Sequence, residues 1–445
     1  MRRLLFALLI ATTLRAQERG KLVEHVAAKS DPTQTYTLYL LSTYDAAKSY
    51  PVLLVLDPRG RSVVAAEIFR EAAEEYGWIL ISSNDTRSDV VENNPNAKAL
   101  NALLPDALDR YASDDRRIYF AGFSGTTMLS WSYAIWSKKI AGVIGVGGRY
   151  VDEIPPAQFN FAHYGFSGDV DFNNLPMRKV EHVLDEKATR PHRFETFEGD
   201  HRWITSSLAR DAMGWLEIIA MKEQRRTRDD ALIARLYDRD VAAAATLSPL
   251  DALRRYRAIA RTYEGLHALD AINAKITALE NDATVKRALK DEQQWDAFED
   301  QYLNEVHPRA MQFLQDRNLS AGYRIGELKK RAKKSGPEGA TARRLLEASF
   351  TQLGYYLTTQ LFAMKRYDDA VAALTTALEI HEDRWPLWYN LGAAQARRRD
   401  KRHALDALEK AIAAGFNDAR MLANDEDYAN VRGDARYAAL LVRLR

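Results

Sequence analysis

The stretch Arg117-Ile118-Tyr119-Phe120-Ala121-Gly122-Phe123-Ser124-Gly125-Thr126 runs from an apolar strand pattern into a serine between glycines and then into helix-forming residues. A serine hydroxyl is a weak nucleophile unless a sharp strand-to-helix turn presents it to a base and to amide N–H groups that stabilise an oxyanion. The alternative is that Ser124 only caps the helix that begins at Gly125. Because Gly-x-Ser also arises by chance, its surroundings have to decide between these interpretations.

An acid and a histidine follow the serine along the chain, and their order is informative. Residues 166–173 (FSGDVDFN) hold two aspartates after an apolar run, and residues 197–203 (FEGDHRW) hold a histidine after another short strand. The order serine, acid, histidine is that of α/β-hydrolases and differs from the orders of chymotrypsin and subtilisin. We therefore predict Ser124 as the nucleophile and His201 as the general base, because a neutral imidazole takes the serine proton near neutral pH.

The orienting acid is either Asp169 or Asp171. Residues two apart in an extended segment point the same way, so their spacing leaves both open, and we prefer Asp171. Asp200, beside the histidine in the sequence, is expected to be a turn residue. The remaining histidines show no metal-ligand spacing, so neither a metal nor another cofactor is predicted.

Backbone amides near the serine are expected to form an oxyanion hole. Gly125, directly after the nucleophile, should donate its N–H, and its lack of a side chain eases the approach. The second donor should come from the loop after the apolar strand 51–56, where Pro58 has no N–H and Arg59 is the best candidate; the alternative is a plain Pro-Arg-Gly turn. Thr126 stands where glycine usually completes the Gly-x-Ser-x-Gly pattern, and a β-branched residue there could shift the turn.

The substrate pocket is expected at the carboxyl ends of the strands, where open α/β sheets bind ligands. Trp203 would supply an apolar wall. Asn84 and Arg87, in the loop after the strand 79–82, lie where they would line the pocket, and Arg87 or Arg59 would supply a polar contact to the acyl or alcohol group. The alternative is that Trp203 only packs the histidine loop.

Length, charge and cysteine content limit the number of domains, the class of partner and the chemistry of the chain. The chain has 445 residues, a net charge of +2 and no cysteine, so we expect two to three domains, no nucleic-acid partner, no disulfide and no lipid-modified cysteine. Residues 1–16 combine two arginines, an apolar run and a small-residue site ending at Ala16, which predicts a cleavable signal peptide; the alternative is an N-terminal core helix. The run is too short to span a bilayer. We therefore expect a periplasmic or secreted protein without a membrane anchor.

From residue 36 to residue 222 the chain alternates short strands with helices, which predicts a parallel sheet covered on both faces within a domain of residues 17–222. The expected strands are residues 36–41, 52–56, 79–82, 118–121, 142–146, 161–166 and 193–197. The expected helices are residues 63–76, 97–111, 126–136, 177–187 and 206–221. A charged run at 223–230 then introduces a region with the pattern of amphipathic helices throughout.

The helical region contains an internal repeat of 34 residues, the period of tetratricopeptide repeats. The matching pairs are Leu357 and Leu391, Ala370 and Ala404, Leu374 and Leu408, and Ala377 and Ala411. Two copies cannot bury their apolar faces alone. We therefore expect residues 223–347 to supply neighbouring helices and residues 348–445 to form the repeats, with capping helices over 417–444. The alternative is an ordinary helical bundle with coincidental spacing.

Four motifs in the first half resemble the esterase branch of the α/β-hydrolases that includes polyhydroxybutyrate depolymerases and feruloyl esterases. They are Leu56-Asp57-Pro58-Arg59-Gly60-Arg61, Gly122-Phe123-Ser124-Gly125, Gly168-Asp169-Val170-Asp171-Phe172-Asn173 and Phe197-Glu198-Gly199-Asp200-His201-Arg202-Trp203. The resemblance implies an α/β-hydrolase domain that cleaves carboxylic esters without metal or cofactor, and it favours Asp171 as the triad acid. The second helical copy is similar to a tetratricopeptide repeat at Trp388, Leu391, Gly392, Ala404, Leu408 and Ala411, with Gln395 and Phe416 where tyrosine and proline are usual.

These expectations combine into an exported serine hydrolase that acts on a carboxylic ester through an acyl-enzyme, with a helical region that binds a protein partner or covers the cleft. A serine peptidase is the runner-up, because the same triad cleaves amides. A binding scaffold with a weakly active or inactive hydrolase domain is the alternative from another class.

Overall fold

The structure, a computed structural model, describes residues 18–88, 95–148, 159–187 and 190–444. The predicted signal peptide lies outside these ranges. The chain divides into two compact units. The first contains residues up to Gly168, Leu175–Phe197 and His201–Asn281, and the second contains Asp169–Asn174, Glu198–Asp200 and the residues from Asp282 onward.

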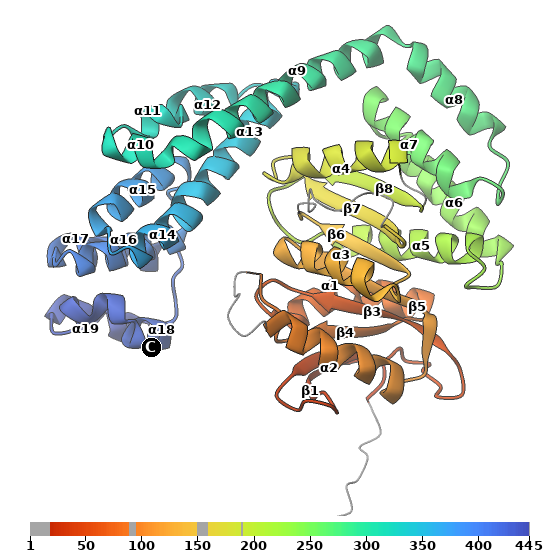
Figure 1. Cartoon of the computed structure of the whole chain (residues 1–445), viewed down its shortest axis with the longest axis horizontal. Helices are drawn as coiled ribbons and strands as arrows, with labels where there is room; N and C mark the ends of the chain where they lie inside the picture. Colours follow the sequence, from red (N-terminus) through yellow and green to blue (C-terminus); the bar gives the residue numbers. More distant parts are fainter. Residues whose placement is uncertain (1–17, 89–94, 149–158, 188–189, 445) are drawn as a thin grey trace, which may run out of the picture. The chain divides into compact units, whose positions relative to one another are not determined.

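The first unit is built on an eight-stranded sheet with the order β1-β2-β4-β3-β5-β6-β7-β8 (Figure 1). Its strands are β1 (Leu22–Ala27), β2 (Thr35–Tyr39), β3 (Tyr50–Leu56), β4 (Ile79–Ser83), β5 (Ser113–Phe123), β6 (Gly142–Val146), β7 (Ala162–Gly168) and β8 (His192–Phe197). β2 pairs antiparallel with β1 and β4, whereas the pairs from β4 to β8 are parallel. The register pairs Leu56 with Gly122 and Gly168 with Phe197, so the loops after β3, β5, β7 and β8 all leave the same edge of the sheet.

Helices connect the parallel strands and cover the sheet. They are α1 (Ser62–Tyr76), α2 (Pro95–Arg110), α3 (Gly125–Ser137), α4 (Asn174–Lys187) and α5 (Ser206–Lys222). β3, β4 and β6 are buried along their whole length, as expected of strands with helices on both faces, and α1 packs against α5. The predicted fold class of this part, a mostly parallel sheet covered by helices, is confirmed.

Three further helices belong to the same compact unit. They are α6 (Asp230–Ala244), α7 (Pro249–Tyr263) and α8 (Asp270–Asn281). Arg193 on β8 is 3% exposed, and its guanidinium donates to both carboxylate oxygens of Asp240 on α6 at 3.1 and 2.9 Å. The indole of Trp215 on α5 donates to the hydroxyl of Thr262 on α7 at 3.1 Å. The compact unit therefore extends to Asn281, beyond the change of sequence character at Lys222.

The second unit is helical from Asp282 onward. Its elements are α9 (Ala283–Val306), a 3₁₀ turn (His307–Arg309), α10 (Ala310–Gln315), α11 (Leu319–Gly322), α12 (Ile325–Arg331), α13 (Gly336–Thr351), a π-helical turn (Gln352–Leu357), α14 (Thr358–Ala363), α15 (Tyr367–Ile380), α16 (Trp385–Arg397), α17 (Lys401–Ala413), α18 (Ala419–Asn424), a 3₁₀ segment (Glu426–Val431) and α19 (Ala435–Arg443). The predicted all-helical character of this part is confirmed.

The repeated small residues of this unit lie where helices meet. The residues that recur at the 34-residue spacing are fully buried in α15 and α17: Ala370, Leu374, Ala377, Ala404, Leu408 and Ala411. On α16, a Cβ at Gly392 would lie 2.3 Å from the hydroxyl oxygen of Tyr428, which itself donates to the carbonyl of Tyr389 at 2.7 Å. The C-terminal segment thus packs directly on α16, while the assignment of these helices to tetratricopeptide repeats stays a prediction.

Candidate active site

Ser124 lies on a sharp turn between β5 and α3. Its backbone angles, φ 54° and ψ −128°, are ones that residues with a side chain rarely adopt. The chain passes very close to its neighbours here: a Cβ at Gly122 would lie 2.4 Å from the carbonyl oxygen of Thr126, and a Cβ at Gly125 would lie 2.4 Å from Cβ of Ser88. Both positions therefore require glycine. The turn leaves Ser124 partly exposed, as a strand-to-helix turn that presents a nucleophile requires.

Thr126 fits this turn without displacing it. The residue is fully buried, and its hydroxyl accepts a hydrogen bond from the amide of Phe123 at 3.0 Å. The same hydroxyl lies 2.5 Å from the carbonyl oxygen of Leu56 at the end of β3 and 2.8 Å from that of Phe123, both within reach of its proton. The threonine therefore joins the end of β3 to the turn at the end of β5.

The structure brings Ser124 and His201 together. Nε2 of the histidine lies 2.9 Å from Oγ of the serine, a hydrogen-bonding distance. The imidazole lies against the ring of Phe123, the residue before the serine, with the ring centroids 4.7 Å apart and the planes inclined by 34°. His201 is partly buried, so its ring is held by packing while its edge reaches the serine.

The two candidate acids have different surroundings. One carboxylate oxygen of Asp169 accepts the amide of Gly199 at 2.8 Å, and the amide of Val170 donates to the carbonyl of Gly199 at 3.1 Å, so these groups tie the loops after β7 and β8 to each other. Asp171 is fully buried. Its Oδ1 accepts the amide of Asn173 at 2.8 Å, in the turn that leads into α4. Each carboxylate thus accepts one backbone amide, and the choice of Asp171 as the orienting acid stays a prediction.

The loop after β3 is organised by Asp57, a residue that sequence reasoning passed over. Its buried carboxylate accepts the amides of Arg59 at 2.8 Å and Arg61 at 3.2 Å, and it pairs with the Arg61 guanidinium at 2.9 Å. The predicted oxyanion donor Arg59 therefore directs its N–H at Asp57, and this prediction is not supported by the structure. The sequence signal for Asp57 is an aspartate directly after a fully apolar strand, and this signal does not report the partners of its carboxylate.

The three predicted substrate-binding residues have internal hydrogen-bond partners. The indole N–H of Trp203 donates to Oδ2 of Asp57 at 2.9 Å. The side-chain amide of Asn84 donates to the hydroxyl of Thr35 at 3.0 Å, and its oxygen accepts from Ser62. The guanidinium of Arg87 donates to the carbonyls of Asn84 at 2.8 Å and Thr86 at 2.6 Å. These contacts hold the loops in place, so a role in binding substrate stays a prediction for all three.

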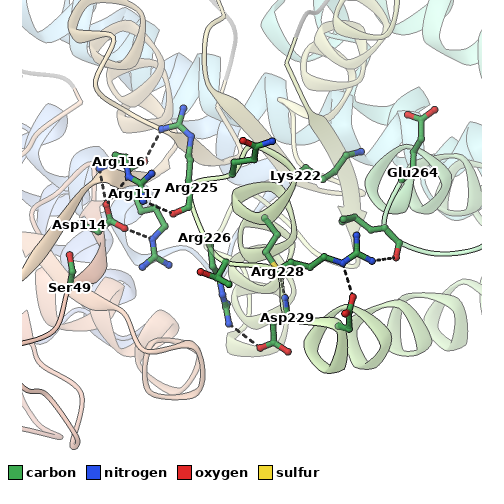
Figure 2. A pocket seen from close by; sticks show the side chains of 16 residues that line it. Ser49, Asp114, Arg116, Arg117, Lys222, Arg225, Arg226, Arg228, Asp229 and Glu264 are labelled. Carbon is green, nitrogen blue, oxygen red and sulfur yellow. Dashed lines mark hydrogen bonds and ion pairs between the residues drawn. The ribbon is translucent and has the colours of Figure 1, made fainter.

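A broad hollow of about 1260 Å³ lies elsewhere on the first unit, where the start of β5 meets the segment after α5 (Figure 2). Six basic side chains line it: Arg116, Arg117, Lys222, Arg225, Arg226 and Arg228. Each of the five guanidinium groups is paired with a carboxylate, as in the pairs Arg117–Asp114 at 2.8 Å and Arg228–Asp230 at 2.7 Å, and Lys222 donates to the carbonyl of Arg261 at 2.7 Å. The hollow therefore offers little uncompensated positive charge to a ligand.

The described ranges contain neither a candidate metal site nor a candidate membrane-spanning helix. No group of three or more histidine and acidic side chains there is arranged to hold a metal ion. Among the helices of the described ranges, none is both long enough and apolar enough to cross a bilayer.

Comparison with known proteins finds no family and only solved structures of low similarity. No protein-family model matches the chain, and no curated protein matches it. Among solved structures, a ferulic acid esterase is similar over 45% of this chain and 98% of its own, with 18% identity and a TM-score of 0.37. A fluorophosphonate-binding serine hydrolase of Staphylococcus aureus covers 44% of this chain and 96% of its own, with 13% identity and a TM-score of 0.36. An S-formylglutathione hydrolase of the same organism covers 45% and 98%, with 14% identity and a TM-score of 0.36.

Proposed function

We propose that the protein is a serine hydrolase that cleaves carboxylic esters through a covalent acyl-enzyme. The observation that carries this proposal is the 2.9 Å contact between His201 Nε2 and Ser124 Oγ, formed at a partly exposed serine with φ 54°. A serine that only capped α3 would need neither the strained turn nor an imidazole at hydrogen-bonding distance. The α/β-hydrolase fold is compatible with this chemistry, although fold alone does not establish it.

In the proposed reaction Ser124 Oγ attacks the ester carbonyl while His201 Nε2 takes the hydroxyl proton. Gly125 is the first residue of α3, so its amide N–H has no carbonyl acceptor within the helix. This N–H is proposed to stabilise the oxyanion. Collapse of the tetrahedral intermediate returns the proton to the leaving alcohol and leaves an acyl-serine. Water then attacks, with its proton passing to His201, and releases the acid. Asp171 is proposed to orient the imidazole and stabilise its protonated form.

Covalent labelling tests this function directly. A fluorophosphonate probe should label the wild-type chain at Ser124, and the substitution Ser124→Ala should abolish both labelling and hydrolysis of a p-nitrophenyl ester. Labelling confined to another residue, or none in folded protein, would favour a binding scaffold. Hydrolysis of a peptide substrate at a higher kcat/KM than any ester would instead favour the peptidase.

The other parts of the proposal come from the sequence. We propose export directed by residues 1–16, whose basic, apolar and small-residue regions follow the order of a cleavable signal peptide. We also propose that the helical repeats bind a protein partner or cover the cleft, since repeats of this kind stack into extended binding surfaces.

A further inference from the structure

The buried carboxylate of Asp57 joins two loops that are distant in the sequence. Asp57 follows β3, and Trp203 follows β8 in the loop that carries His201; the two residues are 146 positions apart. Of the two carboxylate oxygens, Oδ1 accepts the amides of Arg59 and Arg61 and the Arg61 side chain Nε at 3.1 Å. Oδ2 accepts the Arg61 Nη2 and the Trp203 indole, each at 2.9 Å.

Two aromatic rings also pack against the indole of Trp203. Its ring lies 5.5 Å from the ring of Phe123, inclined by 35°, and 6.0 Å edge-on from the ring of Phe69. The ring of Phe123 also contacts the imidazole of His201. An unbroken series of contacts therefore runs from Asp57 through Trp203 and Phe123 to the histidine that touches Ser124.

The charge state of Asp57 suits this task. Burial alone raises the pKa of its carboxyl, but hydrogen bonds from Arg61, Trp203 and the Arg59 amide outweigh burial and lower that pKa below its ordinary value. The carboxylate is therefore ionised at neutral pH. Hydrogen bonds to a buried ionised acceptor are shorter and about twice as strong as neutral ones, so they resist rotation of the indole.

We propose that Asp57 is a positioning residue, which acts through the indole N–H of Trp203 to hold the His201 loop so that Nε2 faces Ser124. This inference rests on the proposed hydrolase function. It assigns Trp203 to the orientation of the catalytic base and not to the wall of the substrate pocket. The two roles differ kinetically: loss of a pocket wall raises KM, whereas loss of orientation lowers kcat.

The test removes the hydrogen bond in one variant and its charged acceptor in another, while an aromatic ring stays at position 203. Trp203→Phe retains an aromatic side chain against Phe123 and deletes the donor, and Asp57→Asn retains the size of the acceptor and deletes its charge. Each variant should lower kcat for a p-nitrophenyl ester by about 10- to 100-fold, as expected for a displaced catalytic base, with KM changed less than twofold. The rate of fluorophosphonate labelling at Ser124 should fall by the same factor. The double variant should lose no more than the worse single variant.

A matched control is Trp136→Phe, the same substitution at a side chain that is 74% exposed on α3; its rates should equal those of the wild type.

If wild-type protein is labelled and active but Trp203→Phe keeps its kcat, or changes only by a raised KM, the positioning role is refuted while the hydrolase function stands. If wild-type protein is neither labelled nor active, the hydrolase function itself fails. If Trp203→Phe does not fold, the comparison of Asp57→Asn with Arg61→Gln tests the proposal. Arg61→Gln preserves the hydrogen bond from the indole and should therefore lose less activity than Asp57→Asn. A greater loss in Arg61→Gln would overturn the proposal.

Discussion

Arg193 on β8 and Asp240 on α6 form a bidentate ion pair that joins the last strand of the sheet to a helix beyond Lys222. The guanidinium lies between Asp240 and the ring of Tyr164, 5.1 Å from the ring centroid. Asp240 also accepts from Arg255 at 3.3 Å and from the hydroxyl of Tyr263 at 3.2 Å on α7. The pair therefore lies at the centre of a polar network that joins β8, α6 and α7.

The first prediction concerns the energy of this pair. Arg193→Met should lower the free energy of unfolding by about 3 kcal/mol, because Asp240 would keep a buried charge with weaker compensation from Arg255. Urea unfolding measures the loss. Arg228→Met, which removes an exposed pair with Asp230, is the control and should change stability by less than about 1 kcal/mol. Equal effects of the two substitutions would contradict the prediction.

The second prediction concerns where the first unit ends. A chain of residues 17–281 should melt at a higher temperature than a chain of residues 17–222, since only the longer one keeps Asp240 and the contact between Trp215 and Thr262. A difference of about 3 kcal/mol corresponds to roughly 6–12 °C for a unit of this size. Thermal melting followed by circular dichroism compares them, and coincident melting curves would place the boundary at Lys222 after all.

The third prediction is that Ser124 and His201 act as one unit. Ser124→Ala and His201→Ala should each lose about as much kcat as the double variant, because members of a triad are strongly non-additive. Steady-state kinetics on a p-nitrophenyl ester measures all three. If the losses of the single variants multiply in the double variant, the two residues contribute independently and the proposed pairing is wrong.

The fourth prediction separates the two candidate acids. Asp171→Asn should lower kcat by about 10⁴-fold, because an asparagine would favour the wrong imidazole tautomer. Asp169→Asn should cost far less activity but should lower the melting temperature, since its carboxylate accepts the Gly199 amide that ties two loops together. A severe loss of kcat in Asp169→Asn with a mild one in Asp171→Asn would reverse the assignment.

The fifth prediction is a pH dependence of stability. Burial, and then the nearby Asp185, raises the pKa of Glu181 on α4 from 4.5 to about 7. The folded state thus prefers the neutral acid, so stability from this group is present below pH 4.5 and is lost as the pH rises through 7. Glu181→Gln should therefore be more stable than the wild type at pH 8, by at most about 3 kcal/mol, with no such gain at pH 4.5. Glu186→Gln, at an exposed position on the same helix, is the control for urea unfolding at both pH values.

Much of this fold follows from local pattern. The strands and helices of the sheet lie within a few residues of their predicted positions, because buried parallel strands are nearly continuous apolar runs. β1 is the exception: it contains Glu24 and His25, lies at the edge of the sheet and has no buried residue, so its sequence lacks a strand signal. Edge strands receive less burial and therefore constrain their residues less.

The candidate site was predictable only in part. The order of serine, acid and histidine along the chain indicates Ser124 and His201, and the structure places them in contact. The hydrogen bonds of Arg59 and Trp203 were not predictable, because both depend on the buried Asp57 carboxylate, and burial of a single charge is set by residues from several strands at once. Local patterns do not report which of two distant loops will share such a charge.

The hydroxyl of Thr126 has a consequence for how relatives of this chain are found. A glycine in this position would pack as closely but would have no hydroxyl to join the ends of β3 and β5. A sequence filter that demands glycine two positions after the serine would discard this chain and any protein built the same way. A filter that accepts threonine there, provided that glycine precedes the serine by two positions, would retain them.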